Sequence, residues 1–101
     1  MAVISVATIT VAPGRWDDFI EGTKQAKTIL ERLGAKNVRL LGELAGAVGS
    51  TAVHSTFEAD DLASLGKVMD SIYADADMLA LMQNGTAVSW TSSILGEIPL
   101  D

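Results

Sequence analysis

Three side chains in this sequence could carry out proton chemistry on a small molecule. His54 is the only histidine, and imidazole is the side chain best suited to act as a general base near neutral pH. Glu43 could orient it if two adjacent strands place both on one face. Tyr73, the only tyrosine, could polarise a carbonyl or hold a phenolic ligand. The alternative interpretation places His54 in a hydrogen-bonded subunit interface and Tyr73 in the core.

Three further residues could bind a ligand without reacting with it. Trp16 and Trp90 could form flat walls around a polycyclic or quinol ligand, because aromatic faces supply contact area and stacking. Alternatively, both pack against the rest of the chain, with Trp16 at a helix end. Arg39 is expected on the strand face that carries Glu43 and His54, where it could contact a ligand or join a polar interface.

Other kinds of site are not indicated. The chain has no cysteine, and therefore no thiolate nucleophile or thiolate metal ligand. It also has no nucleophilic triad pattern, no phosphate-binding glycine loop and no pair of histidines at metal-ligand spacing. Asp75 and Asp77 are too few ligands for a divalent cation. We therefore expect a site without metal or organic cofactor.

The length and composition bound the kind of protein. A chain of 101 residues is expected to form a single domain, residues 1–101, and a 49% hydrophobic composition argues against disorder. Its net charge of −6 disfavours nucleic acids and anionic membrane surfaces as partners. No apolar run approaches the roughly 18 residues of a membrane span, and no signal peptide is visible, so a cytoplasmic location is expected.

The spacing of apolar residues predicts the elements that must position these side chains. Alternating and β-branched stretches favour four strands, and three- and four-residue spacings favour helices that begin at Trp16 and after Asp60 or Asp61. Pro13-Gly14 and Gly34 mark a turn and a helix end. The predicted strands cover residues 2–11, 38–45, 50–57 and 86–95, with a loop at 46–49; the helices cover 16–33 and 62–76, with a short extra turn through 82.

This order, βαββαβ, predicts a ferredoxin-like α+β domain with a four-stranded antiparallel sheet. Two helices can cover only one face of such a sheet. If the two middle strands pair so that Leu41 lies opposite His54, one face collects Arg39, Leu41, Glu43, Ala52, His54 and Thr56, and the core face collects Val38, Leu40, Leu44, Val53 and Phe57. The second helix is expected to point Leu62, Leu65, Met69, Ile72, Tyr73 and Ala76 inward. The first strand is apolar on both sides, so a second subunit is the simplest cover for the exposed face.

Four stretches resemble the dimeric α/β-barrel superfamily, and the resemblance extends over essentially the whole chain. They are the opening VISVATITV, the turn and helix start PGRWDDF, the approach to the second strand GAKNVRLL, and YADADMLALMQ after the second helix. The last is similar to an Asp-Pro-Glu-like, Leu-rich segment, with Ala76 in place of the proline. Proteins of the antibiotic-biosynthesis-monooxygenase, NIPSNAP and stress-responsive barrel types are the ones most resembled.

The resemblance implies two ferredoxin-like subunits packed sheet against sheet, and small-molecule chemistry. The expected function is that of a small homodimeric enzyme acting on a hydrophobic, oxygenated small molecule, as a cofactor-independent monooxygenase or an isomerase or cyclase. His54 or Tyr73 would then move or polarise the proton. The alternative is a non-catalytic dimer that binds a small ligand or serves a structural role. Fold alone does not choose between them, and assembly beyond the dimer stays open.

Overall fold

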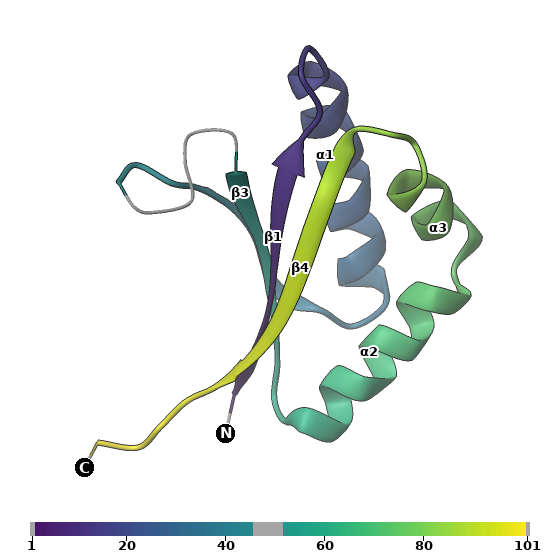
Figure 1. Ribbon diagram of the computed structural model, residues 1–101. Coiled ribbons are helices and arrows are strands. Elements are labelled where there is room, and N and C mark those ends of the chain that lie inside the picture. Colours follow the sequence, from purple (N-terminus) through teal and green to yellow (C-terminus); the bar gives the residue numbers. More distant parts are fainter. Residues whose placement is uncertain (1, 46–51, 101) are drawn as a thin grey trace.

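The computed structural model describes residues 2–45 and 52–100, and the chain folds into four strands and three helices within these ranges. Figure 1 shows their arrangement. In chain order they are β1 (Val3–Val11), α1 (Trp16–Arg32), β2 (Lys36–Gly42), β3 (Ala52–Ala59), α2 (Leu62–Ala74), α3 (Ala76–Met82) and β4 (Ala87–Gly96).

The strands form one sheet in the order β2-β3-β1-β4, and every neighbouring pair is antiparallel. All three helices lie against one face, which leaves the other face of the sheet uncovered by any described element (Figure 1). We call these the helix face and the open face. The predicted ferredoxin-like α+β fold is thereby confirmed, and α3 is the short extra turn expected after the second helix.

Two aspartates begin the later helices. The Asp61 carboxylate accepts a hydrogen bond from the backbone N–H of Ser64 at 2.7 Å, and this bond lowers the pKa of Asp61. Asp75 separates α2 from α3. Its carboxylate accepts from the Met78 N–H at 2.9 Å and pairs with Arg32 at 2.8 Å, and these two contacts, the backbone bond first, lower the pKa of Asp75. The pairing attaches the start of α3 to the end of α1.

The register of the two middle strands is as predicted, with Leu41 opposite His54 and Arg39 opposite Thr56. The limits of these two strands differ from the predicted ones by two or three residues. β2 starts at Lys36 and ends at Gly42, and Leu44, expected in the core, lies beyond the strand and is fully exposed. Asn37, which has a φ of 50°, accompanies a register shift near the start of β2. The predicted loop at 46–49 falls outside the described residues.

The buried stripe of α2 also differs from the expected one. Leu65, Val68 and Ile72 are buried at a spacing of three and four, whereas Tyr73 is 60% exposed because it lies about 100° around the helix from Ile72. Leu62, the first residue of α2, is 64% exposed, and Ala76 belongs to α3 and is exposed too. The expected inward placement of Leu62 and Ala76 is therefore wrong, and Tyr73 lies at the edge of the inward face rather than in the core.

The helix face carries two separate groups of buried side chains. One surrounds Leu65 and includes Val3 at the start of β1, and the other joins Ile9 and Val11, at the far end of β1, to Phe19. The two residues of β1 that lie between them on this face, Ser5 and Ala7, are small. The core is consequently divided in the middle of the sheet, and the candidate site lies in that gap.

Candidate functional site

Small residues leave a cavity between the sheet and the helices. On the sheet side these are Ser5 and Ala7 of β1 with neighbours on β3 and β4, and on the helix side they are Gly22, Thr23 and Ala26 of α1. The larger side chains before and after them, such as Phe19 and Leu30, pack in the core and also line the cavity. The result is a cavity of about 190 Å³ in the middle of the helix face.

The walls of this cavity are mainly apolar. Aliphatic, thioether and aromatic side chains from both layers line it: Ile9, Phe19, Leu30, Phe57, Met69, Ile72, Met78, Leu81, Met82 and Trp90. Asn84 and Thr86 add polar groups at one end, where the Asn84 side-chain oxygen accepts from the Thr86 N–H at 3.0 Å and from its hydroxyl at 2.8 Å. Such a lining suits an apolar ligand that carries a few polar atoms.

Tyr73 and Trp90, two of the six candidate residues, line the cavity. Tyr73 comes from the end of α2, and its exposure places it where the cavity meets solvent. Trp90 lies on β4 beside Ile9 of β1. Trp16 is not among the lining residues. Its ring stacks on Phe19, with 6.0 Å between ring centroids, so it packs at the start of α1 behind a residue that does line the cavity.

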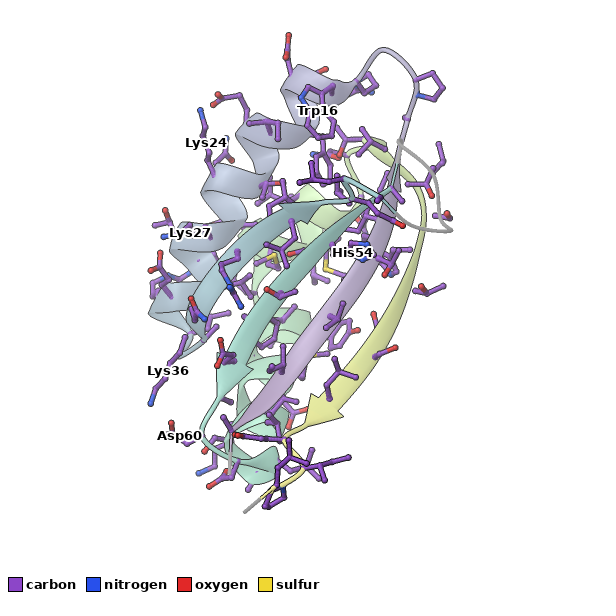
Figure 2. All side chains as sticks on the ribbon, turned by 90° about the vertical axis from the view of Figure 1, so that its left-hand side faces the viewer. Trp16, Lys24, Lys27, Lys36, His54 and Asp60 are labelled. Atoms are coloured by element: carbon purple, nitrogen blue, oxygen red, sulfur yellow. The ribbon has the colours of Figure 1, made fainter. Side chains whose placement is uncertain are left out.

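The other three candidates gather on the open face, where Figure 2 shows His54. His54 Nδ1 lies 2.9 Å from the Thr8 hydroxyl, and His54 Nε2 lies 3.5 Å from a Glu43 carboxylate oxygen. The expected proximity of Glu43 to His54 is thus present. Arg39 lies on the edge strand β2, where its guanidinium group is 4.0 Å from the Glu58 carboxylate.

The sheet separates these two groups. Successive side chains of a strand point to opposite faces, so His54 is turned away from the cavity that its neighbour Ser55 lines. Within one chain, His54 and Glu43 therefore cannot act together with Tyr73 and Trp90 on a ligand in the cavity. By the same alternation, five further strand hydroxyls belong to the open face: Thr8, Thr10, Ser89, Thr91 and Ser93.

Sequence reasoning missed the serines that line the cavity. Ser5, Ser55 and Ser92 come from three neighbouring strands, and Ser55 and Ser92 lie opposite Ala7 on its two sides. A signal for them was present in β1, whose helix-face positions read Val3, Ser5, Ala7, Ile9 and Val11, with two small residues between large ones. The small residues of α1 on the other side of the cavity, Gly22 and Ala26, lie one helical turn apart and give a second signal.

Within residues 2–45 and 52–100, no three His, Asp or Glu side chains are placed to hold a metal ion together. Among the helices described, none combines the length and apolar character that crossing a membrane requires.

No family model and no curated protein matches this sequence. Solved structures, in contrast, do match the fold of the chain. A NIPSNAP domain protein of Burkholderia xenovorans superposes with a TM-score of 0.76 at 15% identity, over 95% of this chain and 94% of its own. A Bordetella bronchiseptica protein provisionally assigned as an antibiotic biosynthesis monooxygenase gives 0.75 at 16% identity, over 97% and 98%.

A Nitrosomonas europaea protein with the same provisional assignment gives a TM-score of 0.73 at 13% identity, over 96% of this chain and 90% of its own. This chain has the fold of these proteins. The resemblance seen in the sequence is confirmed at the level of the fold, over nearly the whole length of both chains.

Proposed function

We propose that this protein binds a compact, mainly apolar small molecule with at least one oxygen function in the cavity of the helix face. The observation that carries this proposal is the row of small residues on β1 and α1 that divides the core. Interiors normally pack to the density of organic crystals, so a gap of this size at the centre of a sheet calls for an occupant.

The cavity volume sets the size of that occupant. Apolar cavities of about 150 Å³ hold benzene, so about 190 Å³ accommodates a six-membered ring with a small substituent. The apolar walls supply most of the binding free energy through burial, and the few hydroxyl groups orient the ligand. A much larger polycyclic molecule would have to extend into solvent past Tyr73.

The same proposal includes a homodimer formed through the open face. That face presents Ile4 and Val6 of β1 and Leu41 of β2, and no described element covers it. A second copy would bury this surface, and the Thr8, His54 and Glu43 cluster would then lie within a polar part of the interface. The bond to Thr8 fits this interface role, which leaves the cavity on the opposite face free for the ligand.

A second candidate function is catalysis in the cavity, as a cofactor-independent monooxygenase or as an isomerase or cyclase. Two observations favour it: the neighbours provisionally assigned as monooxygenases, and Tyr73, the one Asp, Glu, Lys, Arg, His or Tyr side chain among the described lining residues. In that case the Tyr73 hydroxyl would donate to the reacting oxygen of the ligand. His54 faces away from the cavity and takes no part in this mechanism.

The first test is native mass spectrometry of freshly purified protein, followed by denaturation and identification of any released compound. A dimer that releases a neutral oxygenated ring compound supports the proposal. Incubating that compound in air with wild type and with Tyr73→Phe then tests catalysis. Monooxygenation of a phenol or quinol to a quinone by O2 adds one oxygen atom to the compound and removes two hydrogen atoms, which leave with the second oxygen atom as water, and isomerisation changes retention but not mass. Turnover by wild type that Tyr73→Phe loses supports catalysis, whereas an unchanged compound leaves binding as the function.

Filling the cavity gives a second test that needs no natural ligand. Ala7→Leu places a larger side chain in the cavity, so it should abolish binding of a neutral aromatic ketone such as acetophenone while keeping stability within about 1 kcal/mol of wild type. Ala63→Leu, on the exposed side of α2, is the matched control. Undiminished ketone binding by a folded Ala7→Leu protein would contradict the proposed location.

A further inference from the structure

The serines that line the cavity are arranged around one residue. Ala7 on β1 lies directly between Ser55 on β3 and Ser92 on β4, and Ser5 lies two residues away on the same face of β1. Adjacent strands are about 4.8 Å apart, so the hydroxyl groups stand around the Ala7 methyl at distances comparable with the width of a six-membered ring. We call Ser5, Ser55 and Ser92 the serine floor.

These hydroxyls are available to a ligand. Ser5 is only 9% exposed, yet it lines the cavity, and no hydrogen bond joins the side chain of Ser5, Ser55 or Ser92 to another residue in the described part of the chain. These oxygens are not sealed from solvent, since none of them is among the enclosed side-chain atoms that lack a partner and Ser92 is exposed, so water can reach them when the cavity is empty. A ligand oxygen, which can accept from or donate to a serine hydroxyl, can take the place of that water.

The charge of the lining narrows the ligand class further. Among the described residues that line the cavity there is no Lys, Arg or His, and no Asp or Glu. A carboxylate or phosphate placed on the serine floor would give up its hydration without a counter-charge, which is unfavourable in an apolar enclosure. A carbonyl or hydroxyl compound makes the same hydrogen bonds without that cost.

We propose that the serine floor favours uncharged ring compounds over hydrocarbons and carboxylates of the same shape, with the carbonyl or hydroxyl oxygen of the ring compound pointing to the sheet. This selection rests on the binding function proposed above. The ring lies on Ala7, and its oxygen hydrogen-bonds to Ser5 and to one of the flanking serines. The specificity-determining residues are then on the sheet, and Tyr73 stands at the solvent end.

Three probes of nearly equal shape test this selection: acetophenone, a ketone; cumene, its hydrocarbon counterpart; and benzoate, an anion. Dissociation constants from ligand-observed NMR should show acetophenone binding about 5- to 150-fold more tightly than cumene, the value expected for two net hydrogen bonds. Benzoate should bind on the order of tenfold or more weakly than acetophenone.

The variants assign the preference to named hydroxyls. Ser5→Ala combined with Ser55→Ala and Ser92→Ala should remove the preference for acetophenone over cumene and leave cumene binding unchanged or tighter. Ser92→Ala alone, at an exposed position where folding is least at risk, should remove part of it. Ser93→Ala, the next residue of β4 and on the open face, is the matched control and should keep the wild-type preference.

The outcomes separate the two proposals. Equal binding of acetophenone and cumene to wild type, or a preference that survives in the triple variant, would contradict selection by the serine floor. It would leave the proposed binding in the cavity unaffected. Tightest binding by benzoate overturns the selection for uncharged ligands. A folded wild-type protein that binds none of the three at millimolar concentration overturns the binding function itself.

Discussion

His54 shows how the position of one residue decides its role. As the only histidine it is the most obvious proton carrier in the sequence, but the structure places its ring on the open face, 2.9 Å from the Thr8 hydroxyl and 3.5 Å from Glu43. The cavity lies on the other side of the sheet. Its polar contacts therefore serve the sheet and the interface proposed on it.

Replacing His54 separates these roles. His54→Ala should lower the free energy of unfolding by about 0.5–1.5 kcal/mol, the net value of a lost hydrogen bond, and should weaken dimerisation. Acetophenone binding should stay within about twofold of wild type, because the cavity is untouched. Denaturant titration, native mass spectrometry and ligand-observed NMR measure the three quantities. Loss of ketone binding in a folded, dimeric His54→Ala protein would show that His54 takes part in ligand binding.

Asp75 couples stability to pH at the junction of α2 and α3. Its pKa is lowered by the Met78 backbone bond and by Arg32, so the ionised carboxylate favours the folded state. That contribution is complete above the ordinary aspartate pKa of about 3.9 and is lost as pH falls through the lowered folded-state value. Asp75→Asn keeps a capping oxygen but removes the charge.

The urea midpoint of Asp75→Asn should accordingly lie below that of wild type at pH 7, and the two midpoints should converge as the pH falls below about 3. Asp77→Asn, two residues further on in the first turn of α3, is the control and should remain nearer to wild type at pH 7. A gap between wild type and Asp75→Asn that is the same at pH 7 and pH 2.5 would mean that the Asp75 charge contributes nothing.

Two leucines of α2 differ strongly in burial. Leu65 is 1% exposed and packs in the larger core group, whereas Leu62, one turn earlier on the same helix, is 64% exposed. Leu65→Ala should cost about 2–5 kcal/mol of unfolding free energy, and Leu62→Ala should change it by no more than about 0.5 kcal/mol. Chemical denaturation of both variants tests this, and similar costs would contradict the observed orientation of α2.

The elements themselves were largely predictable, because each depends on local pattern. Trp16 marks the start of the first helix, Gly34, with φ of 103°, follows its end, and Asp61 and Asp75 begin the later helices. Leu44 and Leu62 were misplaced because a strand end and a helix rotation depend on tertiary packing, which short-range spacing does not specify. The hairpin register was predictable because a shift of one residue would move Phe57 out of the core.

The site was less predictable than the elements. Sequence reasoning looks for reactive side chains, and the cavity is made by the opposite signal, small residues such as Ser5, Ala7 and Ala26 at positions that face the core. Recognising them requires knowing that β1 and α1 face each other and in which register. The two aromatic residues Tyr73 and Trp90 were named as candidates because of their type, and the topology places both at the cavity.

For the whole molecule, we propose a cavity on the helix face together with a dimer formed through the open face. Val6 lies near the middle of β1 on the open face, between Thr56 and Ser93. Val6→Asp would bury a charge at the centre of such a dimer and should shift the protein to monomers at micromolar concentration. Ala63→Asp adds the same charge to the exposed side of α2 and should leave the dimer intact.

Native mass spectrometry or sedimentation velocity measures this shift. A Val6→Asp protein that remains dimeric, or a wild type that is monomeric at all concentrations, would contradict dimerisation through the open face. Neither result would affect the cavity, because its described lining residues come from the helix face of one chain.

The most direct test of the central claim is to follow the cavity residues by NMR while acetophenone is added. Met69, Met78 and Met82 line the cavity together with Trp90, so a spectrum of methionine methyl and tryptophan indole signals reports on it from several sides. We expect these methyl signals and the Trp90 indole signal to shift together and saturate with one dissociation constant, while the methyl signals of exposed Leu44 and Leu100 do not move. Unchanged methionine and Trp90 signals at millimolar acetophenone, in a protein that is folded, would contradict this claim.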